Sequence, residues 1–172
     1  MKRATLAAIS VLLFGSTGCT GAELELEARW RPLERIAESS AWPEGIATTI
    51  GTTVWTRDLE VLLQRYPEGP ERDGLLLHER EHAARQKASG SILSWVAEYA
   101  TSPEFMWAEE SRGWFLQLRL LQAHGRRGSA ERTAAALSKY ETIQGGRPMI
   151  GYADALKWVR EVLSGRWKPP AE

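Results

Sequence analysis

The sequence is poor in cysteine and in long apolar runs, and each shortage limits what the protein can be. Its 172 residues include one cysteine, Cys19, so no intramolecular disulfide can form. The uncharged apolar run at residues 4–14 is too short for a membrane-spanning helix, which needs roughly 20 apolar residues. Basic and acidic residues are equal in number, 22 of each, and interspersed. No nucleic-acid partner is indicated, because binding a phosphate backbone needs clustered Lys and Arg.

The amino-terminal residues have the pattern of an export signal. Lys2 and Arg3 precede the apolar run, and small residues lead to Cys19. Residues 16–19 (Ser-Thr-Gly-Cys) resemble the lipobox of bacterial lipoproteins, in which the cysteine receives lipid and becomes the mature amino terminus. We therefore expect an exported protein, anchored by lipid on Cys19 in the bacterial envelope, at its periplasmic face or the cell surface. The alternative is an ordinary secretory signal with a cysteine near its cleavage site.

The rest of the chain has room for one domain. We expect a signal peptide over residues 1–19, a helical arm over 20–45, a domain over 46–165 and a tail over 166–172. The arm is predicted from residues 20–40, which are rich in Glu, Arg, Leu and Ala, with Pro32 starting a second helix. The sequence also contains eight Trp, for which core packing is the first explanation.

The domain is predicted to be α+β and predominantly α-helical. Residues 46–57 are dense in β-branched residues and interrupted by Gly51, which indicates two short strands or one bulged strand, and no other segment is convincingly β. Residues 66–74 are predicted to be a loop. Helices are predicted over residues 75–89, 92–99, 103–124, 129–143 and 152–163.

One motif in the first of these helices carries chemistry. Residues 78–82 read His-Glu-Arg-Glu-His, which satisfies HExxH. On a helix His78 and His82 lie on one face, one turn apart, so both imidazoles can reach one zinc ion. Glu79 would then act as general base toward zinc-activated water and return the proton to the leaving group. The alternative is an exposed helix that carries these residues as ordinary solvated side chains.

A catalytic zinc site commonly takes a third protein ligand. The extension HExxHxxGxxH fails, since residues 85 and 88 are Arg and Ala, so a metzincin is not indicated. Glu109 and Glu110, on the long helix about 30 residues downstream, are the candidates. We prefer Glu110, because Trp114, Gln117 and Leu121 extend its face along one helical stripe. Glu109 remains open.

The stretches TTIGTTVW, LLLHEREHAARQ and EESRGWFLQLR together resemble the bacterial HExxHxxQ metallopeptidases of the gluzincin kind, over about residues 46–123. The resemblance implies a zincin-like core with an active-site helix and a small β element. It also implies zinc held by His78, His82 and Glu110, with Glu79 as the base. Gln86 lies on the same helix face and is a candidate partner of the metal ligands.

Other residues are candidates for roles around this site. In zincins an edge strand commonly pairs with an extended peptide substrate, and residues 52–55 are the candidate by position; the alternative is a strand that only packs on the helix. Glu81 is a candidate ion-pair partner of Arg85, one turn away. The candidates for polarising a substrate carbonyl are His124, Tyr99, Tyr140 and Tyr152, and spacing selects none of them.

The sequence therefore predicts a zinc-dependent metallohydrolase, a peptidase whose partners are a peptide or protein substrate and, through its lipid, a membrane. Arg80 and Glu81 stand inside the motif where active peptidases usually have uncharged residues. They keep open a catalytically inactive envelope scaffold or binding module that retains the helix, with or without structural zinc. Adhesion through a Trp-rich surface is a further alternative, which predicts exposed Trp and no metal.

Overall fold

The computed structural model describes residues 35–39, 47–126, 128–142 and 146–170. Over these residues the fold is α+β and mostly helical, as predicted. The elements in chain order are β1 (Arg35–Glu38), β2 (Ala47–Ile50), β3 (Thr53–Thr56), α2 (Leu59–Arg65), α3 (Pro70–Ala88), α4 (Ile92–Thr101), α5 (Pro103–Ala123), α6 (Ala130–Leu137) and α7 (Tyr152–Leu163). The predicted signal, Cys19 and most of the predicted arm lie outside the described residues.

The strands form one sheet in the order β1-β3-β2, so β3 is its central strand. β2 and β3 are antiparallel, with Thr49 opposite Val54, and Gly51 takes a φ of +61° at the turn between them. This left-handed conformation suits glycine, which has no Cβ to clash with the backbone. The prediction of two short strands within residues 46–57 is confirmed.

The helix predicted over residues 20–40 is wrong where the structure describes it. Arg35–Glu38 is β1, which pairs in parallel with β3, Ile36 lying opposite Val54. Residues 46–57 are consequently not the only β segment. Local helix propensity is a weak preference, and here the backbone hydrogen bonds offered by β3 outweigh it. That pairing joins residues distant in sequence, so no local pattern announces it.

Two further corrections concern the segment before the motif. Helix α2 was not predicted; it begins after Asp58, whose carboxylate accepts a hydrogen bond from the backbone N–H of Val61, and it buries Leu62. The predicted loop over residues 66–74 is shorter, because α3 already begins at Pro70. Proline is favoured in the first turn of a helix, where its missing N–H leaves no bond unmade.

The remaining helices lie close to their predicted positions. Helices α4, α5 and α7 each begin at the predicted residue, and α4 ends two residues later than predicted. Helix α6 ends at Leu137 rather than near residue 143, because Glu141 pairs with Pro148 in an isolated β-bridge. The backbone therefore leaves the helix to make this bridge.

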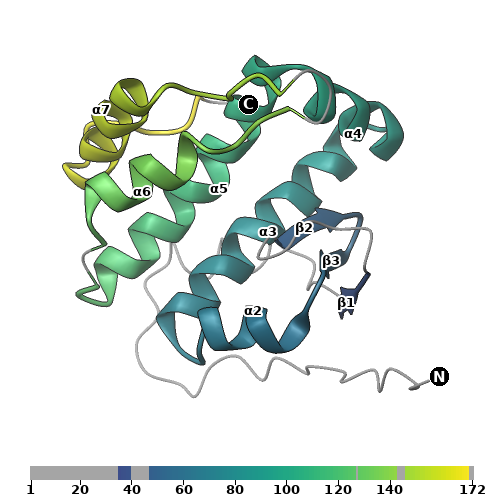
Figure 1. Cartoon of the computed structure of the whole chain (residues 1–172), viewed down its shortest axis with the longest axis horizontal. Helices are drawn as coiled ribbons and strands as arrows, with labels where there is room; N and C mark the ends of the chain where they lie inside the picture. The colour runs from purple at the N-terminus through teal and green to yellow at the C-terminus, as the bar shows by residue number, and fades with distance from the viewer. Residues whose placement is uncertain (1–34, 40–46, 127, 143–145, 171–172) are drawn as a thin grey trace.

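Helices α3 and α5 run side by side through the middle of the molecule, with α2 and the sheet on the outer side of α3 and with α6 and α7 beside α5 (Figure 1). The apolar core lies between α5, α6 and α7 and includes Leu118, Leu137, Trp158 and Val162. The HExxH helix is thus held between this core and the sheet. No described helix is both long and apolar enough to cross a membrane.

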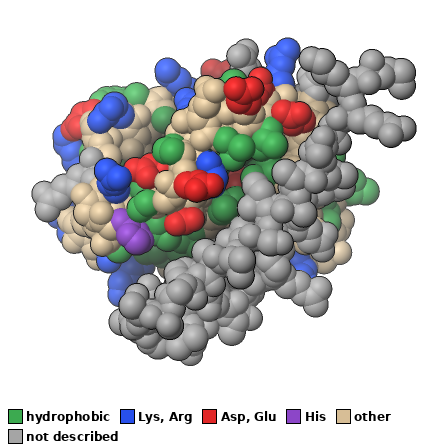
Figure 2. Space-filling view, turned by 90° about the horizontal axis from the view of Figure 1, so that it is seen from below, with side chains coloured by type: hydrophobic (Ala, Val, Ile, Leu, Met, Phe, Trp, Pro, Cys, Tyr) green, Lys and Arg blue, Asp and Glu red, His purple; other side chains and the backbone are tan. Residues whose placement is uncertain are grey.

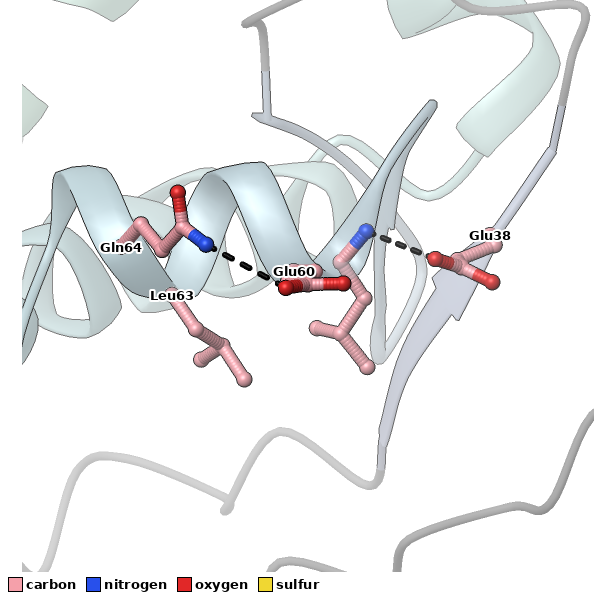
Figure 3. Close-up of a pocket in the computed structure, with 5 residues that line it drawn as sticks. Glu38, Glu60, Leu63 and Gln64 are labelled. Carbon is pink, nitrogen blue, oxygen red and sulfur yellow. Dashed lines mark hydrogen bonds between the residues drawn. The ribbon is translucent and has the colours of Figure 1, made fainter.

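The surface offers little that points to a ligand. Acidic and basic side chains are interspersed on the described part of the face in Figure 2. A shallow hollow of about 550 Å³ lies between β1 and α2 (Figure 3), where Glu38 accepts a hydrogen bond of 2.7 Å from the backbone N–H of Leu59. None of its lining residues comes from α3 or α5, so it is separate from the motif.

Gln86 attaches the hairpin to α3. Its amide nitrogen donates to the backbone carbonyl of Thr49 at 2.7 Å, and its amide oxygen accepts from the backbone N–H of Gly51 at 2.8 Å. Gln86 is 1% exposed; its bond to Thr49 is buried and its bond to Gly51 is partly buried. Gln86 therefore fixes the end of β2 against the HExxH helix.

We predict that Gln86→Leu lowers the free energy of unfolding by about 2–4 kcal/mol, because one buried and one partly buried backbone group lose their partners. Urea denaturation followed by circular dichroism measures this loss. Gln64→Leu is the control, since Gln64 is exposed on α2 and bonds only Glu60 among the contacts described. Equal stability of the two variants would contradict the anchoring role.

Candidate metal centre

Helices α3 and α5 are antiparallel at the motif. Contacts between them pair Gly74 with Gln117, His78 with Gly113, and His82 with Glu110, so residue numbers rise along one helix as they fall along the other. The approach is closest at Gly113, where a Cβ atom would lie 2.5 Å from Cδ2 of His78. Any side chain there would displace the imidazole.

The structure brings His78, His82 and Glu110 together. The two Nε2 atoms are 3.0 Å apart, and the Glu110 carboxylate places Oε2 3.3 Å from Nε2 of His78 and Oε1 3.2 Å from Nε2 of His82. All three side chains are buried. Two imidazole nitrogens and a carboxylate thus converge from two helices on one point.

This cluster fits a divalent cation. Nε2 of His78 and Nε2 of His82 face each other, while Oε2 of Glu110 is buried and makes no hydrogen bond with the described residues, although Nε2 of His78 lies 3.3 Å away. A buried carboxylate oxygen without a donor is costly unless a cation compensates it. Imidazole nitrogen with carboxylate oxygen is a donor set that Zn²⁺ takes in proteins.

The electrostatics of the metal-free cluster show the same need for positive charge. Burial by itself lowers the pKa of His82, but the charge of Glu110 and its hydrogen bond, together with the charges of Glu79 and Glu109, raise the pKa to about 9. Burial raises the pKa of Glu110, yet His78 and His82 outweigh it and hold that pKa well below its ordinary value. Without a metal, a proton on the imidazole pair therefore neutralises the carboxylate.

Glu79 lies beside the ligands and is held by the sheet. Its Oε2 accepts a hydrogen bond of 2.6 Å from the hydroxyl of Thr49 on β2, and both side chains are buried. Gln86 of α3 fixes the backbone of Thr49, and the hydroxyl of Thr49 in turn holds Glu79 of α3. One residue of the helix therefore orients another through β2. The sequence pointed to neither contact of Thr49.

Gln117 contacts the ligand His78, in place of the predicted Gln86. Its Oε1 lies 3.3 Å from Nδ1 of His78. If Nδ1 carries the proton that this contact favours, Nε2 is free to bind metal. Gln117 follows Glu110 by seven residues, which is about two helical turns, so the stripe predicted on α5 also carries the contact to His78.

Aromatic side chains enclose the cluster. Tyr99 on α4 donates a hydrogen bond of 2.5 Å to Oε1 of Glu110 and stacks on Trp95 with ring centroids 4.9 Å apart. Trp95 in turn meets the ring of His82, and Trp114 meets the ring of His78. Helix α4 therefore covers the candidate metal centre with its inner face.

The four candidates for polarising a carbonyl differ in their exposure and in their contacts. Tyr99 is bound to Glu110, whereas His124 and Tyr152 are exposed on the surface. Burial and the nearby charges of Glu110 and Glu79 raise the pKa of Tyr140 well above its ordinary value. Tyr66, which sequence did not indicate, also has a raised pKa, from burial and, in smaller part, from Glu79. The charge of Glu79 thus contributes to the raised pKa of both Tyr140 and Tyr66.

One expectation about a neighbouring segment is wrong. Residues 52–55 were expected to be an edge strand, but β3 is paired on both sides and has no free edge for a peptide. Arg85, the predicted ion-pair partner of Glu81, holds Glu109 with its Nε and Nη2 atoms at 2.7–2.8 Å, a contact that the sequence did not indicate. Glu109 is consequently turned away from the cluster that Glu110 joins.

No family model, curated protein or solved structure that we compared with the chain matches it. The resemblance to the HExxHxxQ group therefore stays an expectation from the motifs. In that pattern the glutamine would occupy position 85, which is Arg85 here, and Gln86 follows one residue later. The site must be argued from its own geometry.

We predict that Gly113→Ala weakens zinc binding roughly tenfold or more, since the new methyl group displaces the ring of a ligand. It should also lower the free energy of unfolding by about 1–3 kcal/mol through overpacking. Competition titration with a zinc chelator and urea denaturation measure the two effects. In Gly151→Ala, the control, the nearest atom to the added Cβ is Oδ2 of Asp154 at 3.8 Å. Wild-type zinc affinity in Gly113→Ala would show that the close contact between Gly113 and His78 is not needed for zinc binding.

Proposed function

We propose that the protein is a zinc-dependent metallohydrolase, and that it is a peptidase. The observation that carries the proposal is the convergence of Nε2 of His78, Nε2 of His82 and the Glu110 carboxylate, with Glu79 of the same motif beside them. His78, His82 and Glu110 would hold the ion. Bound zinc supplies a Lewis acid that polarises a carbonyl oxygen and lowers the pKa of water.

Glu79 is the residue for proton transfer. It lies on the helix that carries both histidines, and the Thr49 hydroxyl donates to its Oε2, which orients the carboxylate. A carboxylate so placed accepts a proton from the attacking water and gives it to the leaving amine. Orientation by Thr49 limits the rotamers open to Glu79, so less ordering is needed during the reaction.

We infer a zincin-like core from the same elements. An active-site helix (α3), a second helix that supplies a carboxylate (α5) and a strand packed on the first helix (β2) are the parts that the HExxH resemblance implies. With β3 central in the sheet, β2 is the strand nearest the motif. The anchoring of the protein in the envelope by lipid on Cys19 belongs to this proposal as well.

Burial supports a second candidate function, a structural metal centre in an envelope scaffold. His78, Glu79 and His82 are each at most 5% exposed, and Tyr99 and Trp95 cover the ligands. Structural zinc sites are closed, whereas catalytic sites keep a position open for water and substrate. Adhesion through tryptophan has less support, since no Trp among the described residues is exposed.

Metal analysis of the purified protein tests the centre. We predict about one zinc per chain, lost in His82→Ala and in Glu110→Gln and retained in Glu109→Gln, the matched neighbour. Elemental analysis after dialysis measures the stoichiometry. Absence of zinc from the wild type, or its retention in Glu110→Gln, would overturn the assignment.

Glu79→Gln separates the two candidate functions. For a peptidase it keeps zinc and loses roughly 10²–10⁴-fold in turnover of a cleaved peptide, because the general base is gone. A peptide library read by mass spectrometry provides the substrate screen. A zinc-loaded wild type whose cleavage pattern equals that of Glu79→Gln would establish the structural centre instead.

A further inference from the structure

We propose that Arg85 is a positioning residue that reserves the metal for Glu110 by holding the adjacent Glu109 away from it. The inference rests on the proposed metal centre and explains how one of two neighbouring carboxylates on α5 is selected. Neither Arg85 nor Glu109 belongs to the HExxH motif.

The contact between Arg85 and Glu109 is forked and buried at its acidic end. Nε of Arg85 lies 2.8 Å from Oε1 and 2.7 Å from Oε2 of Glu109, and Nη2 lies 2.7 Å from Oε1. The Glu109 side chain is 1% exposed, against 25% for Arg85. A guanidinium that contacts both oxygens fixes the orientation of the carboxylate, which a single point charge would not do.

Arg85 stands in register with the metal ligands. His78, His82 and Arg85 follow one another at spacings of four and three residues, so they share the face of α3 that meets α5. On α5, Glu110 faces the histidines and Glu109 faces the arginine. Because the helices are antiparallel, the arginine meets the glutamate one position closer to the start of α5.

Glu109 would otherwise compete for the metal. It precedes Glu110 directly on α5, and its side chain is 1% exposed, so it is buried next to the cluster. An unpaired buried carboxylate beside a divalent cation gains most of its stabilisation by turning toward the cation. Arg85 removes this gain, because it already supplies positive charge and hydrogen bonds to both oxygens of Glu109.

The net charge of the buried groups also balances the charge of a divalent ion. Glu79, Glu109 and Glu110 are buried carboxylates, and Arg85 neutralises Glu109. The remaining pair, Glu79 and Glu110, matches the two positive charges of Zn²⁺. Loss of the arginine would leave an excess negative charge at the centre, which changes both the number and the kind of ligands that the ion attracts.

Cobalt(II) is the probe for this proposal, since its visible absorption reports the ligands around it. We expect Arg85→Met to change the spectrum of the Co²⁺-loaded protein and to weaken Co²⁺ binding roughly tenfold. Adding Glu109→Gln to Arg85→Met should restore the wild-type spectrum, because glutamine no longer competes as an anion. Glu109→Gln alone should leave the spectrum unchanged. A residue that only stabilised the fold would lower stability without moving the spectrum.

Arg160→Met is the matched control, since Arg160 pairs with Glu131 on the exposed surface at 3.1 Å. If Arg85→Met does not fold, Arg85→Lys takes its place, because an ammonium keeps the charge but cannot grip both oxygens. An unchanged spectrum in the arginine variant, or no restoration by Glu109→Gln, overturns the positioning role while the metal centre stands. A wild type that binds no Co²⁺ or Zn²⁺ overturns the centre itself.

Discussion

Helices α3 and α5 can bring their ligands together only because Gly113 has no side chain. His78 occupies the space that a Cβ at this position would need, 2.5 Å from its ring. With the helices this close, a carboxylate on α5 reaches the imidazoles of α3 without crossing water. The position of the sheet depends on the same helix, because Gln86 and Glu79 on α3 hold β2.

The close packing of α3 and α5 buries several carboxylates, whose negative charge must be compensated. Burying Glu79, Glu109 and Glu110 in one region removes three carboxylates from water, which is unfavourable unless each finds a donor or a cation. Arg85 supplies the positive charge beside Glu109, and the Thr49 hydroxyl donates to Glu79. A metal ion would supply positive charge to Glu110 and Glu79. In its absence the raised pKa of His82 shows a proton taking part of that role. The chemistry and the stability of this region are therefore parts of one arrangement.

Much of this site could be predicted from local sequence. The spacing of His78 and His82 places them on one helix face wherever the helix lies, and the stripe of Trp114, Gln117 and Leu121 after Glu110 indicated the side of α5 that turns inward. Glycine and proline marked the helix ends well, as at Gly125 and Pro103. The contact of Arg85 with Glu109, by contrast, was not predicted, because the two residues are 24 apart in sequence.

What escaped prediction depends on contacts between distant segments. β1 forms only because β3 offers it a parallel edge, and β3 becomes central for the same reason. Thr49 reads as one of several β-branched residues until the hairpin is placed against α3, where its hydroxyl meets Glu79. Such pairings are set by tertiary packing, which no periodicity of a single segment encodes.

The central claim is that two imidazoles and one carboxylate from α3 and α5 hold a single zinc ion. X-ray absorption spectroscopy of the zinc-loaded protein at the zinc edge tests it most directly. The account predicts nitrogen and oxygen ligands at about 2.0–2.1 Å, with scattering from two imidazole rings and no sulfur. Sulfur at about 2.3 Å, or a spectrum without imidazole scattering, would contradict it.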